Sequence, residues 1–124
     1  MIINADFAIE ITPTEPLLPT TGRFEFSKVW SGGADGASKG VMVSSGNPAK
    51  GTAGYVAMEV FEGRIGSMEG SVSFQQFGTM VGGEQRLQYE VTPGSGTGDF
   101  IGVLGELHLT IDEDGRHHVR FDIA

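Results

Sequence analysis

Residues 23–30, with the sequence RFEFSKVW, decide the fold class because large apolar and polar side chains alternate along them. Successive side chains of a β-strand point to opposite faces, so every second residue shares a face. One face of this octapeptide therefore carries three aromatic rings and one lysine: Phe24, Phe26, Lys28 and Trp30. An alternation with a period of two predicts a half-buried strand and not a helix.

The same alternation recurs along the chain, and no stretch has the period of an amphipathic helix. We expect seven further strands, in residues 1–11, 37–45, 55–63, 71–80, 85–91, 106–112 and 116–124. Turn-forming stretches separate them, and the proline-rich residues 12–22 form a loop between the first two strands. Closing an antiparallel meander of about eight strands covers its apolar face and removes its free edges. We therefore predict an all-β protein, a single β-barrel domain over residues 1–124, whose interior is filled by side chains or holds one small ligand.

The composition excludes several classes of function. The chain has 124 residues, no cysteine and a net charge of -8, so disulfides and thiolate sites are excluded and binding to nucleic acid or to an anionic membrane is not expected. No apolar run approaches the roughly 18 residues that span a bilayer. The first residues alternate like a strand and do not resemble a signal peptide, so we expect a cytoplasmic protein.

The glycine-rich stretch VTPGSGTGDF, residues 91–100, raises the question of a phosphate site. A dinucleotide fingerprint requires glycine where Asp99 stands, and a phosphate-binding loop requires a lysine that is absent. We therefore interpret this stretch as a connection between two strands at one rim of the barrel, where gating of an interior cavity is one option.

The histidines and the acidic turn do not indicate a metal site. Neighbouring residues of a strand point to opposite faces, so His117 and His118 cannot chelate one ion. His108 and His118 could meet on the outside, but no third ligand stands beside them. Residues 112–115, DEDG, lack the length of a calcium loop and are interpreted as a hairpin tip. We predict no metal and no cofactor.

Polar residues on apolar faces are the strongest candidates for a site. Lys28 shares a face with Phe26 and Trp30, and Glu59 shares one with Tyr55. A charge buried alone is costly, so Lys28 and Glu59 could neutralise each other inside the barrel. Gln76 and His117 also lie on apolar faces, and the complete predicted ligand-binding set is Lys28, Trp30, Tyr55, Glu59, Phe74, Gln76, Tyr89 and His117.

The strand over residues 55–63 is apolar on both faces, so the pattern leaves open which face is inside. If Glu59 points inward, the opposite face and the neighbouring strand present an outer apolar patch of Val41, Val43, Val56, Met58 and Val60. Such a patch indicates a homo-oligomer interface. If the register is shifted by one residue, these side chains form the core and Glu59 is exposed.

Four stretches resemble a family of bacterial proteins of unknown function: SKVWSGGADGASKGVM, GTAGYVAMEVFEG, GSVSFQQFGTM and VTPGSGTGDFIGVLGELHLTI. The resemblance covers nearly the whole chain and implies a barrel like that of allene oxide cyclases, without an established activity. Where the family is expected to carry Gln-His, this chain has Gln75 and Gln76, which argues against a shared acid–base mechanism through that imidazole.

Three functions follow from these patterns. The first is a barrel that binds a small, partly apolar ligand inside. The second is an isomerase, cyclase or lyase in which Glu59 acts as acid or base and Lys28 sets its charge. The third is a structural or interaction protein with a filled barrel that acts as an oligomer. The sequence favours the first and identifies no substrate.

Overall fold

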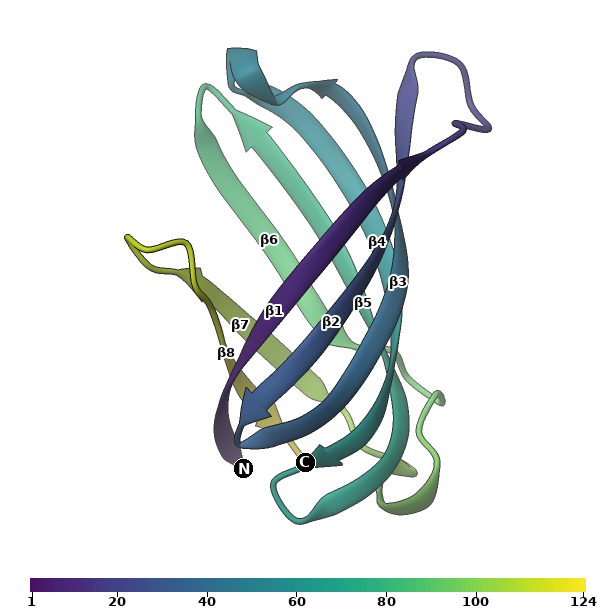
Figure 1. Ribbon diagram of the computed structural model, residues 1–124, viewed down its shortest axis with the longest axis vertical. Coiled ribbons are helices and arrows are strands. Elements are labelled where there is room, and N and C mark those ends of the chain that lie inside the picture. Colours follow the sequence, from purple (N-terminus) through teal and green to yellow (C-terminus); the bar gives the residue numbers. More distant parts are fainter.

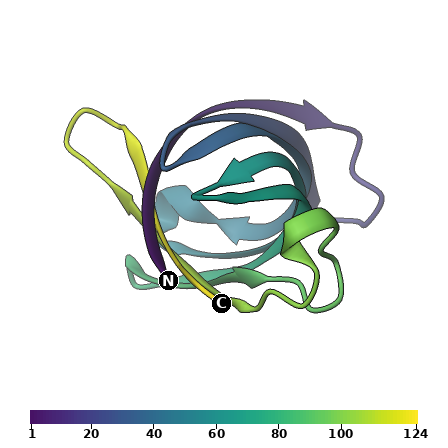
Figure 2. The ribbon, with the colours of Figure 1, turned by 90° about the horizontal axis from the view of Figure 1, so that it is seen from below.

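The computed structural model describes residues 1–124, and its eight strands form one closed antiparallel barrel in which each strand pairs with its neighbours in chain order (Figures 1 and 2). The strands are β1 (Ile2–Thr14), β2 (Thr21–Gly32), β3 (Ala34–Asn47), β4 (Thr52–Ile65), β5 (Met68–Val81), β6 (Glu84–Val91), β7 (Gly105–Ile111) and β8 (His117–Ile123). Two short 3-10 helices, η1 (Pro48–Lys50) and η2 (Gly98–Phe100), lie in connections. The predicted all-β barrel is confirmed. Neither helix is long or apolar enough to span a membrane.

The first six strands are longer, and the connections between them tighter, than the sequence pattern predicts. The predicted loop 12–22 shrinks to residues 15–20, because Thr12, Pro13 and Thr14 still pair with β2. Beyond Phe7, β1 has no partner on its β8 side. Pro13 cannot donate a backbone hydrogen bond, and it is tolerated in a strand that has a free edge.

The barrel wall is weakest beside the hairpin of β7 and β8. Only one residue pair, Glu90 with Glu106, joins β6 to β7, and this hairpin diverges from β6 toward the upper end in Figure 1. The upper halves of β1 and β6 therefore each have a free edge. Three inward-facing residues near this opening, Ile11, Leu87 and Ile111, are 51%, 38% and 60% exposed.

The opposite half of the barrel is filled by aromatic side chains. The ring centroid of Trp30 lies 5.5 Å from that of Phe121, and Phe61 lies 6.0 Å from Phe74. Tilted and edge-on pairs of this kind add about 0.5–1.5 kcal/mol each beyond the area they bury. The barrel is thus a packed core at one end and an open cup at the other.

Residues 92–104 connect β6 to β7 at the packed end. Phe100 is buried and packs edge-on against Phe61 at 6.3 Å. The loop is held to β5 because the hydroxyl of Thr97 accepts from the backbone N–H of Ser71, and the carboxylate of Asp99 accepts from that of Glu69. The interpretation as a connection is confirmed. The option that this loop gates a cavity is wrong, because no residue of it lines the open end.

Two glycines that face the interior make room for aromatic rings. A Cβ atom at Gly40 would collide with the ring of Phe26, and one at Gly78 would collide with the ring of Tyr55. These glycines let large side chains lie flat across the neighbouring strand. They therefore determine the shape of the interior above the aromatic core.

Candidate functional site

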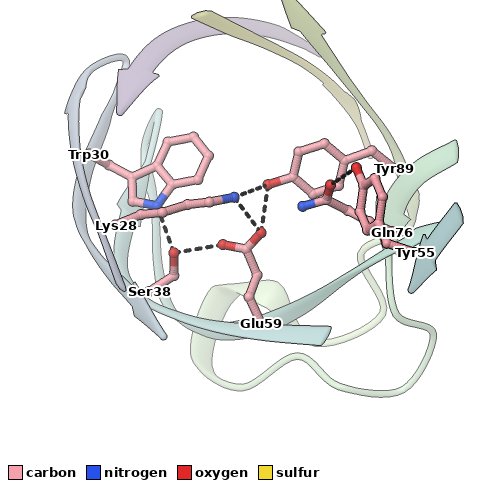
Figure 3. A network of polar contacts seen from close by, with 7 residues as sticks. All are labelled: Lys28, Trp30, Ser38, Tyr55, Glu59, Gln76 and Tyr89. Carbon is pink, nitrogen blue, oxygen red and sulfur yellow. Dashed lines mark hydrogen bonds and ion pairs between the residues drawn. The ribbon is translucent and has the colours of Figure 1, made fainter. Parts of the chain in front are cut away.

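A buried ion pair crosses the middle of the barrel, where Figure 3 shows Lys28 of β2 reaching Glu59 of β4. The Lys28 Nζ lies 2.8 Å from Glu59 Oε1, and the two residues are 3% and 1% exposed. The hydroxyl of Tyr89 donates to the same carboxylate oxygen at 2.7 Å and accepts from Lys28 Nζ at 3.1 Å. The predicted mutual neutralisation is observed, and Glu59 faces inward.

The second carboxylate oxygen of Glu59 is held by a residue that the sequence interpretation missed. The Ser38 hydroxyl donates to Glu59 Oε2 at 2.6 Å and accepts from the indole Nε1 of Trp30 at 3.0 Å. Ser38 lies on the inward face of β3 between two glycines, Gly36 and Gly40. The residues around Ser38 are small and do not alternate between apolar and polar, so the period-two pattern did not show that Ser38 faces inward.

Burial and the ion pair act together on the titrating groups. Burial lowers the pKa of Lys28, while the nearby Glu59 carboxylate opposes this shift. Burial, and then the negative charge of Glu59, raise the pKa of Tyr89 well above its ordinary value. Tyr89 is therefore a neutral phenol at pH 7. The Lys28–Glu59 ion pair, to which it is hydrogen-bonded, has no net charge and lies at the centre of the barrel.

Above this pair lies a cavity of about 130 Å³. Lys28, Tyr55, Gln76 and His117 supply its polar lining, beside apolar residues that include Phe7. The Tyr55 hydroxyl donates to the Gln76 side-chain oxygen at 2.8 Å (Figure 3). The cavity therefore has an apolar wall with a few oriented polar groups, as small-molecule sites do.

His117 forms part of the wall of this cavity. Its ring stacks on that of Phe7 with centroids 4.8 Å apart. Burial, followed by the positive charges of Lys28 and His118, lowers the pKa of His117. His117 is accordingly a neutral imidazole at pH 7.

A wider apolar space of about 440 Å³ adjoins the small cavity at the open end. Met42, Tyr55 and Leu109 line both, so the two spaces lie side by side. The surface of the outer space is mostly apolar, with Phe24, Met80, Leu87 and Ile111 in its lining, and Arg86 also borders it. The result is a cup with a polar floor and an apolar mouth.

The eight residues predicted to bind a ligand divide between two layers. Lys28, Tyr55, Gln76 and His117 line the cavity. The other four, Trp30, Glu59, Phe74 and Tyr89, are nearly fully buried and do not line it. Glu59 and Tyr89 act on the cavity through Lys28, whereas Trp30 and Phe74 belong to the aromatic core. Their role in binding stays a prediction.

The exposed His118 does not meet His108 as a ligand pair. Its ring nitrogens lie against Asp6 and Asp112, and the hydrogen bond to Asp112 is the largest cause that raises the pKa of His118. His108 instead lies 3.7 Å from Glu106. No group of three histidine or carboxylate side chains is arranged to hold a metal ion. The turn at residues 112–115 is a hairpin tip, as predicted.

The outer apolar patch lies on β3 and β4. Met58, Val60, Val56 and Val41 are 46–50% exposed, and Val43 is partly exposed beside them. Phe77 of β5, which the sequence interpretation did not include, pairs with Val56 and extends the patch at 56% exposure. The open question about the strand over residues 55–63 is thereby answered, with Glu59 inside. Assembly of copies through this patch stays a prediction.

The fold and this layered interior define an eight-stranded antiparallel β-barrel with a cup above a buried lysine–glutamate pair. The chain belongs to the DUF3224 family, described as a protein of unknown function, whose family model matches residues 3–123. A solved structure of a DUF3224 protein of unknown function from Shewanella oneidensis MR-1 is similar, with 32% sequence identity and a TM-score of 0.92 over 100% of this chain and 96% of that chain. No curated protein matches the chain. The resemblance to a family of unknown function is confirmed, while the likeness to allene oxide cyclases stays a prediction.

Proposed function

We propose that this protein binds a small, partly apolar molecule inside the barrel. The observation that carries this proposal is that the polar cavity beside Lys28 adjoins the apolar mouth above it. A ligand would place its polar end near Lys28, Gln76 and His117. Its apolar part would extend toward Leu109 and Leu87, where it would be removed from water.

The mouth supplies the driving force in this proposal. Burial of apolar ligand surface contributes about 25 cal/mol per Å² before the cost of association is subtracted. Inward apolar residues such as Ile111 and Leu87 are exposed in the free protein. A ligand that covers them gains apolar contact on both surfaces, which supports an apolar rather than a wholly polar ligand.

Native mass spectrometry of the purified protein, with Trp30 fluorescence as a second signal, tests this proposal. Ala57 lines the small cavity, so Ala57→Phe should fill it and abolish binding of a retained or added ligand. Val56→Phe is the matched control, because Val56 is the preceding residue of the same strand and faces outward. Equal binding by both variants would place the ligand elsewhere and reject the interior site.

The enzymatic alternative, with Glu59 as acid or base and Lys28 setting its charge, has weaker support. Both oxygens of the Glu59 carboxylate accept hydrogen bonds, from Lys28 and Tyr89 on one side and Ser38 on the other. Glu59 does not line the cavity. A proton would have to pass through Lys28 or Tyr89, so we do not assign a reaction.

A further inference from the structure

The floor of the cavity offers hydrogen-bond donors and few acceptors. A lysine ammonium carries three N–H donors. Two of those of Lys28 donate to Glu59 and Tyr89, so one N–H has no hydrogen-bond acceptor in the protein. The Lys28 Nζ lies 4.3 Å from the ring centroid of Phe7 and 5.2 Å from that of Phe26, and both rings line the cavity. Because Lys28 itself lines the cavity, we place the remaining donor at the cavity floor.

Gln76, like Lys28, offers the cavity a hydrogen-bond donor. Its side-chain oxygen is occupied by the Tyr55 hydroxyl, whereas its NH₂ group forms no hydrogen bond within the protein. Gln76 lines the cavity and is only partly buried. Lys28 and Gln76 thus both present donors, and the complementary ligand group is an acceptor.

The charges around the small cavity indicate whether the acceptor group of the ligand is neutral or anionic. Lys28 is the only lysine, arginine, aspartate or glutamate that lines the small cavity, and Glu59 already neutralises it at 2.8 Å. The other titrating groups that line this space, Tyr55 and His117, are neutral at pH 7. A carboxylate placed here would be an unpaired buried anion, which is costly, whereas a carbonyl oxygen adds no charge.

We infer that the ligand is an uncharged carbonyl compound with an apolar chain, whose oxygen accepts a hydrogen bond from Lys28, and that Glu59 excludes carboxylates from the same position. This inference rests on the proposed interior binding function and specifies its ligand class. Glu59 is accordingly a specificity residue that acts through Lys28 without touching the ligand.

The test compares two probes with the same chain length, 2-octanone and octanoate, titrated at pH 7 and followed by Trp30 fluorescence and calorimetry. Wild-type protein should bind 2-octanone at least tenfold more tightly than octanoate. Glu59→Gln leaves Lys28 without its counter-charge and should reverse the order. Glu62→Gln, an exposed change on the same strand, should leave the order unchanged.

A second variant guards against a folding failure of Glu59→Gln. Gln76→Lys adds a cation at a partly buried position and leaves the Lys28–Glu59 pair intact. It should also shift the preference to octanoate, whereas Gln75→Lys, on the outward face of the same strand, should not. Since Gln75 bonds to the exposed Glu90, its replacement does not reach the cavity.

The possible failures are distinguishable. If the wild type binds octanoate as tightly as 2-octanone, the carbonyl inference is overturned while interior binding stands. The inference is also overturned if 2-octanone remains preferred in every folded charge variant. If neither probe binds and Ala57→Phe changes no retained ligand, the proposed function itself is overturned and this inference with it.

Discussion

Replacement of Lys28 by methionine should destabilise the protein strongly and in a pH-dependent way. Methionine keeps most of the length of the side chain but removes the charge that lies 2.8 Å from Glu59. The Glu59 residue is 1% exposed, so water cannot replace the lost partner. Removal of one member of a buried ion pair costs about 3–5 kcal/mol because it leaves the other charge uncompensated.

Proton uptake by the carboxyl of residue 59 limits how much unfolding free energy the Lys28→Met variant loses. In Lys28→Met the carboxyl of residue 59 can escape its charge by binding a proton. Protonating an ordinary glutamate, with a pKa of about 4.3, costs about 4 kcal/mol at pH 7, because each pH unit corresponds to about 1.36 kcal/mol. The folded variant then holds a proton that the unfolded chain lacks, so its free energy of unfolding falls as pH rises. We expect a loss of about 3–4 kcal/mol at pH 7 that shrinks toward pH 5.

Urea unfolding followed by Trp30 fluorescence and circular dichroism measures this loss. The double variant Lys28→Met/Glu59→Gln should be more stable at pH 7 than Lys28→Met alone, since it buries no lone charge. Lys39→Met, an exposed change on β3, is the control and should alter stability little. A loss below about 1 kcal/mol, or one that is equal at both pH values, would refute the argument that Lys28 compensates a buried carboxylate.

Further predictions concern the outer surface. The pKa of His118 is raised above 6.5, mainly by its hydrogen bond to Asp112. Protonated His118 therefore stabilises the fold below pH 6.5, and this stabilisation is lost as pH rises through the raised pKa. His118→Gln should narrow the difference in unfolding free energy between pH 6 and pH 9, measured by urea unfolding. Glu106 stands opposite Glu90 across the β6–β7 seam, so Glu106→Lys should raise stability by about 0.2–1 kcal/mol in the same assay; no gain would mean that this pair does not limit the seam. If copies associate through the outer apolar patch, Val60→Glu should lower the mass measured by light scattering, and an unchanged monomer in both proteins would exclude that interface.

The alternation of side chains predicted the barrel because it depends only on the period of two. It also placed Lys28 inside, since three aromatic rings share its face of β2. The pattern failed for β4, where Val56, Met58 and Val60 are as apolar as the inward set. There the choice of face is made by the partners of Glu59 on other strands, which a local pattern does not contain.

Ser38 and the glycines of the interior show the second limit. Gly40 and Gly78 matter because of the rings that lie over them from Phe26 and Tyr55. Ser38 matters because it joins Trp30 to Glu59. These contacts connect residues from different strands, and small residues have no periodic signal of their own. The lengths of β1 to β5 were underestimated for a related reason, since glycine and proline stay hydrogen-bonded in the sheet when neighbouring strands hold them.

The weak seam beside β7 has a consequence for how separate molecules meet. Free strand edges can add strands from other copies and start aggregation. On β1 this edge carries Pro13, which lacks the donor that a further strand requires. The outward side chains of β6 include Glu84, Arg86 and Glu90, and the chain carries a net charge of -8. The open end of the barrel thus has edges that discourage fibre-like growth between copies.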